Sequence, residues 1–358
     1  MSTRSSEGGE AIDAGLVVHK VDPLNAETAI DALVGGVMMP SARFYVRSNF
    51  PVPALDPDFW RLQVTGLVDE PLLLRLDDLR AMPSHTQVVT LECAGNGRAL
   101  LTPPTPGEQW GLGAVSTAEW TGVPLIEVLE RAGVRSSATE VLFRGSDSGA
   151  APGHAQPVRF ERSLPLEVAR LPEVLLAYAM NGEPLPNQHG FPLRLVVPHW
   201  YAVASVKWLA EIRLVDAPFA GHFQAERYVY EWERDGALVR EPVTLQQVRA
   251  LITEPRAGQT VDAGELVVRG VAWSGAAPIE RVDVSLDGGG WHEAHLVGEV
   301  SDSGWQWWEL TTSVRRVGTV SVRARATDRT GRVQPDRAEW NRLGYGNNSI
   351  QSVDVTVR

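Results

Sequence analysis

One stretch of the N-terminal half, residues 88–98, strongly limits how this chain can fold. Its first four residues, Val88-Val89-Thr90-Leu91, are mostly β-branched and predict a short buried strand. The strand leads into Ala94-Gly95-Asn96-Gly97, a sequence typical of a tight turn with a positive φ angle. Cys93, the only cysteine in 358 residues, lies at this junction. We therefore expect its thiol at the end of a rigid strand, beside a loop that can open toward a ligand.

Three interpretations of Cys93 fit this position. A thiolate is a soft metal ligand and also a nucleophile, and the guanidinium of Arg98 favours the charged sulfur. A buried structural thiol is the third interpretation, but the glycine-rich turn and Arg98 favour the other two. A single cysteine excludes an internal disulfide, a four-thiolate iron–sulfur cluster and covalently attached c-type haem.

The composition is that of a globular protein long enough for two domains. The chain is 44% hydrophobic and 22% charged, and its net charge of -11 argues against nucleic acid as a partner. No apolar run approaches the roughly 18 residues of a membrane-spanning helix. Residues 1–10 are polar and lack the apolar core of a signal peptide. We expect a cytoplasmic protein as the sequence stands, or a periplasmic one if a leader has been removed.

The pattern of predicted elements changes near residue 248, where we place a boundary between domains 1–247 and 248–358. The first domain mixes short strands with short helices, such as one that begins at Leu125 and ends at Gly133. Residues 222–235, rich in aromatic and charged side chains, predict a loop. Beyond residue 255, short alternating strands recur between glycine-rich turns, which is typical of an all-β sandwich.

Two positive charges interrupt apolar segments that predict buried structure. Arg194 lies within residues 193–197, and Lys207 lies within residues 202–209. Because a lone buried cation is costly, each needs a carboxylate or a bound anion as its partner. Together with His189, these cations indicate one phosphate-like ligand, and two separate salt bridges are the other explanation.

Several motifs, in their order and spacing, resemble the sulfite oxidase family of molybdopterin enzymes over nearly the whole chain. They are residues 44–47 with 51–53, residues 90–98, Trp110 with residues 113–120, residues 175–178 with 180–182, residues 189–194, and residues 205–208. The resemblance implies an α+β molybdopterin-binding domain of the sulfite oxidase type, with mixed sheets and short helices. It also implies that an immunoglobulin-like sandwich follows and forms a homodimer.

The same resemblance assigns roles to individual residues. Cys93 is expected to be the thiolate ligand of molybdenum. The residues expected to hold the molybdopterin and its phosphate are Tyr45, Arg47, Ser48, Asn49, Asp147, His189, Arg194, Ser205, Val206 and Lys207. The residues expected around the substrate are Arg47, Arg98, Trp110 and Tyr228. A phosphate in this position would supply the countercharge that Arg194 and Lys207 require.

The activity implied by the resemblance is molybdenum-dependent oxidation of sulfite to sulfate by oxygen-atom transfer. The electrons would pass to an external acceptor such as a cytochrome, since the sequence shows no haem domain and we expect no haem. Gly97 stands where the animal enzymes have a second arginine. Residues 305–310 match a stretch where the animal enzymes have a further arginine, and this stretch contains no arginine here. We therefore expect a less cationic substrate pocket than in those enzymes.

Three alternatives remain at this stage. The weaker pocket charge favours the same cofactor acting on another oxyanion or on an S- or N-oxide, for example as a nitrate or sulfoxide reductase. A cofactor-carrying protein without turnover is disfavoured because Arg47, Arg98 and Tyr228 are all present. A cysteine hydrolase is disfavoured because no motif places a histidine near Cys93.

Overall fold

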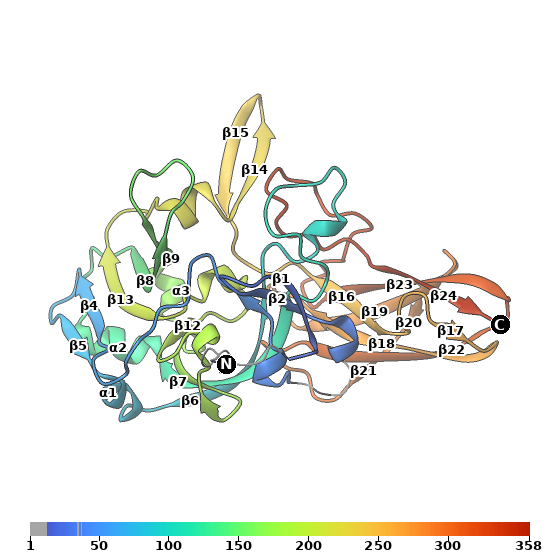
Figure 1. The fold of residues 1–358 in the computed structure, drawn as a ribbon, viewed down its shortest axis with the longest axis horizontal. Helices are drawn as coiled ribbons and strands as arrows, with labels where there is room; N and C mark the ends of the chain where they lie inside the picture. Colours follow the sequence, from blue (N-terminus) through green and yellow to red (C-terminus); the bar gives the residue numbers. More distant parts are fainter. Residues whose placement is uncertain (1–12, 34–35, 37) are drawn as a thin grey trace, which may run out of the picture.

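The computed structural model describes residues 13–33, 36 and 38–358. The expectation about a signal peptide concerns residues 1–10, which lie outside this range. The described chain forms two β-rich parts side by side, with most N-terminal sheets on the left of Figure 1 and the C-terminal sheets on the right. None of the helices in the described ranges has both the length and the apolar character needed to cross a membrane.

Three sheets build most of the N-terminal part. The first contains β1 (Leu16–Lys20), β2 (Asn25–Thr28) and β3 (Val46–Arg47). The second contains β6 (His85–Glu92), β7 (Val115–Pro124), β10 (Leu175–Met180), β11 (Glu183–Pro184) and β12 (Arg194–Val196). The third contains β4 (Leu62–Gly66), β5 (Leu72–Leu74), β8 (Glu140–Gly149), β9 (Val158–Pro165) and β13 (Leu209–Val215). Only the β4–β13 pair of these described sheets is parallel, so the expected mixed sheets are confirmed.

The helices between these strands are short, as expected. They are α1 (Leu76–Arg80), α2 (Leu125–Ala132), α3 (Leu166–Ala169), η1 (Ile30–Leu33), η2 (Ser41–Arg43), η3 (Arg98–Leu100), η4 (Asn187–His189), η5 (Ala202–Ala204) and η6 (His222–Glu226). In α2 the buried residues Leu125, Val128 and Leu129 share one face because they follow the helical period. The helix ends at Gly133, whose φ of 67° and N–H bond to the Glu130 carbonyl form a C-terminal cap.

Two sheets with a common apolar core build the C-terminal part. One contains β16 (Arg249–Glu254), β18 (Gly264–Trp273), β21 (His295–Val297) and β22 (Gln306–Val314). The other contains β17 (Thr260–Val261), β19 (Ile279–Leu286), β20 (His292–Glu293), β23 (Gly318–Asp328) and β24 (Ser352–Val357). Alternate residues of the longer strands, such as Val320, Val322 and Ala324, point into the core between the sheets.

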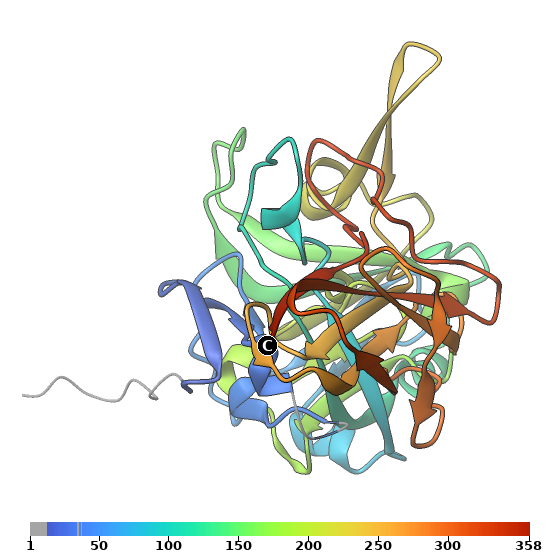
Figure 2. The same cartoon turned by 90° about the vertical axis from the view of Figure 1, so that its right-hand side faces the viewer.

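The segment predicted as a loop over residues 222–235 is partly regular. It contains the short π-helix η6 and β14 (Val229–Arg234), which forms a hairpin with the following strand β15 (Ala237–Pro242). This hairpin projects from the body of the molecule in both views (Figures 1 and 2). Its strand pattern was hidden because charged and aromatic side chains alternate where apolar and polar ones usually do.

The two parts meet at β6, the strand predicted to lead to Cys93. β6 is an edge strand of its sheet, and the C-terminal part covers its free edge. The Thr90 N–H donates to the Ser303 carbonyl of the C-terminal part at 2.9 Å, and the side-chain amide of Gln246, just before the boundary near residue 248, donates to the Thr90 carbonyl at 3.0 Å. An apolar cluster with members such as Leu91 and Trp273 continues across the junction. The strand is therefore buried on both faces at the end that carries Cys93.

A buried ion pair closes this junction. The Arg249 Nη1 lies 3.1 Å from the Glu92 Oε1, and each side chain is 3% exposed. Trp273 and Asn96 donate further hydrogen bonds to the same carboxylate, at 2.9 and 3.0 Å. Burial raises the pKa of Glu92, and the positive charge of Arg249 opposes this shift. The pair is therefore needed to keep an ionised carboxylate next to Cys93.

We predict that Arg249→Met destabilises the protein by about 3–5 kcal/mol, because it leaves Glu92 buried without its countercharge. The matched control is Arg135→Met, which breaks an ion pair with Asp69. The side chains of Arg135 and Asp69 are 54% and 69% exposed. We expect that variant to lose less than about 1 kcal/mol. Urea unfolding followed by tryptophan fluorescence measures both losses. Equal stability of the two variants would contradict a stabilising role for the buried pair.

Candidate functional site

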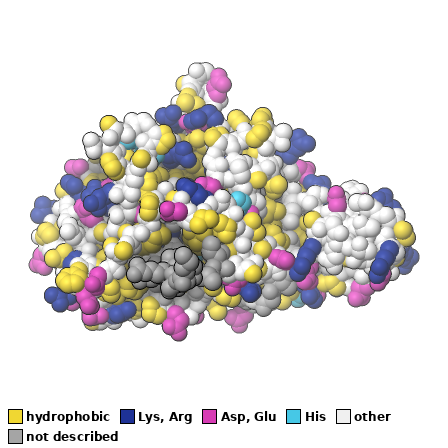
Figure 3. All heavy atoms as spheres, viewed as in Figure 1, with side chains coloured by type: hydrophobic (Ala, Val, Ile, Leu, Met, Phe, Trp, Pro, Cys, Tyr) yellow, Lys and Arg dark blue, Asp and Glu magenta, His cyan; other side chains and the backbone are white. Residues whose placement is uncertain are grey.

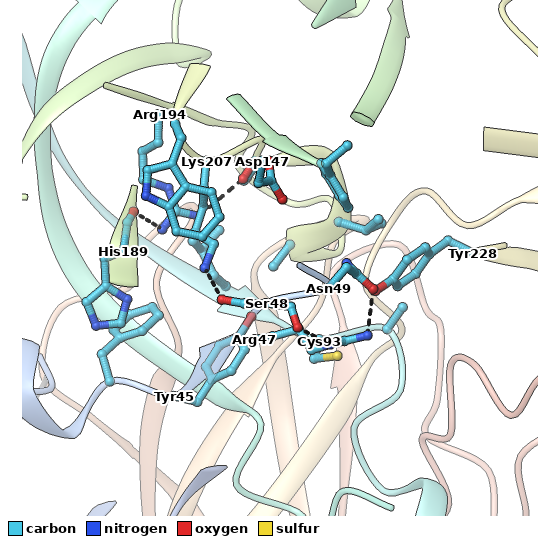
Figure 4. A pocket seen from close by; sticks show the side chains of 18 residues that line it. Tyr45, Arg47, Ser48, Asn49, Cys93, Asp147, His189, Arg194, Lys207 and Tyr228 are labelled. Atoms are coloured by element: carbon cyan, nitrogen blue, oxygen red, sulfur yellow. Dashed lines mark hydrogen bonds between the residues drawn. The ribbon is translucent and has the colours of Figure 1, made fainter. Parts of the chain in front are cut away.

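Most of the side chains predicted to form a site line one cavity in the N-terminal part (Figure 4). Its volume is about 660 Å³, counting the space open to solvent. The predicted residues that line it are Tyr45, Arg47, Ser48, Asn49, Cys93, Asp147, His189, Arg194, Ser205, Lys207 and Tyr228. They come from segments spread between residues 45 and 228, which only the tertiary fold brings together.

Cys93 lies at one end of the cavity, immediately after β6, as expected. Its N–H donates to the Ala114 carbonyl at 2.9 Å, and its carbonyl accepts the Asn96 N–H at 2.9 Å, which closes the predicted turn. Gly97 has a φ of 81°, so the turn does contain the positive φ that its sequence predicted. Burial raises the pKa of the Cys93 thiol, while Arg47 and the Gly95 N–H act in the opposite direction. The anionic sulfur therefore needs a further positive partner, and a metal ion would supply one.

Arg47 and Tyr228 lie beside Cys93 in the cavity lining. The Arg47 guanidinium donates to the side-chain oxygens of Asn25 and Asn49, at 3.0 and 2.6 Å. Among the residues that the structure describes, the Tyr228 hydroxyl contacts the side-chain amide of Asn49 alone, at 3.4–3.5 Å. These contacts fix the arginine firmly and leave the phenol free to form a stronger hydrogen bond to a ligand.

The opposite end of the cavity holds Arg194 and Lys207, the two cations predicted to need an anion. Arg194 donates to the carbonyls of His189 and Ser205, at 3.0 and 3.3 Å. Burial lowers its pKa to about 10. The Lys207 Nζ donates to the Ser48 hydroxyl at 3.0 Å and to the Gln188 carbonyl at 2.7 Å. Burial, together with the charge of Arg194, holds the pKa of Lys207 well below its usual value.

His189 and Asp147 complete this end. Burial, reinforced by the charges of Lys207 and Arg194, lowers the pKa of His189 to about 3, so its imidazole is neutral. Its Nε2 lies 3.1 Å from the Ser41 carbonyl and donates there. Burial raises the pKa of Asp147 to about 6, although the Lys207 ammonium opposes the shift. The polar groups at this end are thus charged or positioned for a ligand that the protein itself does not provide.

Two buried polar atoms indicate which kind of ligand fits the cavity. Within the described residues, the Nε of Arg194 and the Oδ1 of Asp147 are buried without a hydrogen-bond partner. Asp147 is also the only carboxylate in the cavity lining, whereas Arg47, Arg194 and Lys207 are all cations. A phosphate would neutralise the excess cations, and a ring N–H would satisfy Asp147. A molybdopterin carries both kinds of group, and the Cys93 thiol lies in the same cavity to bind its metal.

Three predicted residues do not reach the cavity lining. The Arg98 guanidinium donates to the carbonyls of Leu343 and Glu108, at 3.2 and 2.9 Å, behind the wall. Trp110 is fully buried and packs edge-on against His19, with ring centroids 5.0 Å apart. Val206 is a core residue whose carbonyl accepts the Leu195 N–H at 2.8 Å. These three residues therefore lie outside the lining in which substrate and cofactor were expected.

Residues 305–310, the stretch where the resemblance led us to expect that a pocket arginine is missing, do not lie at the cavity. Residues 306–310 belong to β22, and no residue of 305–310 lines the cavity. A different C-terminal segment, residues 341–347, contacts a residue of the cavity lining. From it, Tyr345 stacks on Tyr228 with ring centroids 5.2 Å apart and accepts the Tyr228 N–H through its hydroxyl at 3.3 Å. Nothing in the local sequence pattern marks this segment, because its contact with residue 228 is purely tertiary.

Arg162 is a second residue that the sequence interpretation missed. It is fully buried in β9 and donates to the carbonyls of Phe223 and Val243, while its Nε has no partner among the described residues. Burial lowers its pKa to about 10, and Tyr228 and Tyr345 oppose the shift. Phe160, Arg162 and Leu164 are spaced two residues apart in β9, so they share one face of the strand. This spacing could have identified Arg162 as an inward-facing cation.

Comparison with known proteins assigns both parts of the chain. Residues 49–223 match the oxidoreductase molybdopterin binding domain, and residues 240–358 match the Mo-co oxidoreductase dimerisation domain. The mitochondrial sulfite oxidase of Rattus norvegicus is 38% identical over 96% of this chain, which spans 66% of that protein. The sulfite oxidase of Arabidopsis thaliana is 34% identical, and the match covers 94% of this chain and 93% of that protein.

Two further matches are informative. A nitrate reductase of Phaseolus vulgaris is 31% identical, and the match covers 94% of this chain but 41% of that protein. The crystal structure of the sulfane dehydrogenase SoxCD from Paracoccus pantotrophus superposes with a TM-score of 0.81. That match has 30% identity and covers 98% of this chain and 94% of the other. The chain therefore belongs to the sulfite oxidase family of molybdopterin-dependent oxidoreductases.

Proposed function

We propose that this protein oxidises sulfite to sulfate at a molybdenum–molybdopterin cofactor and passes two electrons to a separate acceptor, such as a cytochrome. One observation carries the proposal. A single cavity has a buried thiol, an arginine and a weakly bonded phenol at one end, and at the other end two cations, Arg194 and Lys207, against one carboxylate, Asp147. The first end suits a metal that meets an anionic substrate, and the second suits a phosphate.

The residues of the chain divide the work of holding this cofactor. Cys93 is proposed as the ligand of the metal. Arg194 and Lys207 are proposed to bind the phosphate, with Ser48, Asn49, His189, Ser205 and Asp147 positioned for the pterin. When bound, the cofactor supplies oxygen-atom transfer and stores two electrons. No haem is proposed within this chain.

The negative charge of sulfite indicates which residues would bind the substrate. The conversion of sulfite and water into sulfate releases two protons and two electrons. Sulfite is an anion, and the whole chain carries a net charge of -11, so a local cation must attract it. Arg47 is fixed in the cavity lining and can provide this attraction, which is strengthened in a recessed site of low dielectric constant. The Tyr228 hydroxyl can orient the substrate and accept or donate a proton at its Oη.

The C-terminal part has a separate proposed role. We propose that residues 248–358 are an immunoglobulin-like domain that forms a homodimer, and that residues 1–247 are the catalytic domain. The two packed sheets of β16–β24 support this division, as does the match of residues 240–358 to a dimerisation domain. The cellular compartment stays a prediction.

A second candidate keeps the cofactor and changes the substrate to another reduced sulfur compound. The high structural similarity to a sulfane dehydrogenase favours it. The limited number of cations near Cys93 also favours it, because a neutral sulfur group needs less positive charge than sulfite does. Turnover of a persulfide without turnover of sulfite would select this candidate. Nitrate-dependent oxidation of a reduced dye would select the nitrate reductase alternative.

The proposed function predicts sulfite-dependent reduction of ferricyanide and cytochrome c by protein of known molybdenum content. We expect Cys93→Ser to fold normally and to lose more than about 100-fold in kcat, because a hydroxyl is a poorer ligand for this metal than a thiolate. Rates are expressed per molybdenum, so that loss of the cofactor is separated from loss of the ligand. Wild-type turnover in this variant would disprove the assignment of Cys93, and full metal loading without sulfite turnover in the native protein would disprove the substrate.

We predict that Lys207→Met weakens cofactor retention by about ten-fold or more, because a charged hydrogen bond contributes roughly 1.5–3 kcal/mol. Molybdenum and pterin are quantified after dialysis. Lys20→Met, at the exposed end of β1, is the matched control and should retain the cofactor fully. Equal retention by both variants would contradict a phosphate at Lys207.

We predict that Tyr228→Phe lowers kcat/KM for sulfite by about ten-fold or more, because it removes the free hydroxyl and keeps the ring stacked on Tyr345. Molybdenum content and the melting temperature should stay unchanged. Tyr178→Phe, in β10 and outside the cavity lining, controls for a general effect of losing a tyrosine hydroxyl. Native kinetics in Tyr228→Phe would show that the phenol does not take part.

A further inference from the structure

Outside the cavity, three side chains that can bind metals converge on one point. His154 lies in the loop between β8 and β9, and His222 and Glu226 lie one turn apart in η6. Their ligand atoms all lie within 4.8 Å of one another. The Glu226 Oε2 is 3.1 Å from the His154 Nε2 and 2.9 Å from the His222 Nδ1. Both imidazoles thus already point at the same carboxylate oxygen.

The donor set and spacing match a transition-metal site. Two imidazoles and one carboxylate are a common protein ligand set for zinc, and a fourth position then remains open to water. Zinc–ligand distances near 2.1 Å place two tetrahedral ligands about 3.4 Å apart. Both nitrogen–oxygen distances in the cluster lie within about 0.5 Å of this value. An ion can therefore replace the two hydrogen bonds after small side-chain movements.

The local backbone explains why His222 and Glu226 face the same point. η6 is a π-helix, in which the Arg227 N–H donates to the His222 carbonyl at 2.8 Å. This wider turn places side chains four residues apart next to each other, and such turns are frequent at functional sites. The side chain of His222 is 8% exposed, whereas those of His154 and Glu226 are 31% and 48% exposed. One ligand is therefore fixed by packing, and the other two leave a path for an ion from solvent.

The cluster lies against the aromatic wall of the cavity. Phe223, the neighbour of His222, packs on Phe160 with ring centroids 4.7 Å apart and on Tyr228 at 6.2 Å. Phe160 and Tyr228 both line the cavity. The space-filling view shows side chains of several kinds around the base of the projecting hairpin, next to which η6 packs (Figure 3). An ion in the cluster would therefore join the β8–β9 loop to a helix that supports this wall.

We propose that His154, His222 and Glu226 bind one divalent transition-metal ion, with zinc as the best match, and that this ion fixes the β8–β9 loop to η6. The site is separate from Cys93 and uses none of the residues proposed to hold molybdopterin. It does not depend on sulfite being the substrate, since the ligands and their geometry are independent of the cavity chemistry.

The test uses the full chain after treatment with a chelator and removal of the chelator. Zinc chloride is titrated in competition with a chromophoric zinc indicator, and zinc and molybdenum are quantified separately. We expect one zinc per chain with a Kd in the micromolar range or below. We also expect a loss of affinity of about ten-fold or more in His154→Ala and in Glu226→Gln, because each removes one of three protein ligands. His295→Ala, from the exposed β21, is the control and should bind zinc as the native protein does.

A second readout reports on the loop itself. Zinc should slow proteolysis between residues 150 and 157 in the native chain and should have no such effect in His154→Ala. His154 and Glu226 are both partly exposed, so both variants should fold, which the melting temperature without zinc will confirm. The proposal is overturned if the native chain binds no zinc, or if both ligand variants bind it as tightly as the native chain.

Discussion

The buried ion pair between Glu92 and Arg249 is the interaction on which the geometry of the site depends. It joins the last residue of β6 to the first residue of β16, so the residue before Cys93 is tied to the C-terminal part. The Asn347 side chain bonds the Gly97 carbonyl at 2.7 Å, and the Gly346 N–H bonds the Ala94 carbonyl at 2.8 Å. The turn that presents the thiol is thus held by contacts from both the N-terminal and the C-terminal parts of the chain.

The excess of buried cations is the second constraint, and it explains why the site needs its ligand. Among the described residues, Arg194 and Lys207 donate to neutral oxygens, and the single nearby carboxylate, Asp147, balances at most one of the two charges. The cost of burying them lowers their pKa values until an anion binds. A bound phosphate would remove this cost, so its binding would also stabilise the folded chain. Stability and cofactor binding are therefore coupled.

Local patterns predicted much of this structure. The strand before Cys93, its turn and the helix ending at Gly133 all follow from short-range sequence, and the anion predicted for Arg194 and Lys207 stays a prediction. What could not be predicted depends on packing between distant segments. The motif places Arg98 five residues after Cys93, but the carbonyls of Leu343 and Glu108 take its guanidinium behind the wall. Tyr345 reaches Tyr228 across 117 residues of sequence, and no local period records such a contact.

Arg98 lies close enough to the cavity to contribute to its positive charge, although it does not line it. Its guanidinium lies 4.9 Å from the centroid of the Tyr345 ring, and the Tyr345 ring stacks on Tyr228. Arg162 is buried near the same two tyrosines, whose charges bear on its pKa. Two unit charges 8 Å apart still interact by about 2 kcal/mol at an effective dielectric constant near 20. Two arginines behind the aromatic pair can therefore attract an anion without touching it. They add positive charge behind this end of the cavity, while Arg47 is the cation that lines it together with Cys93.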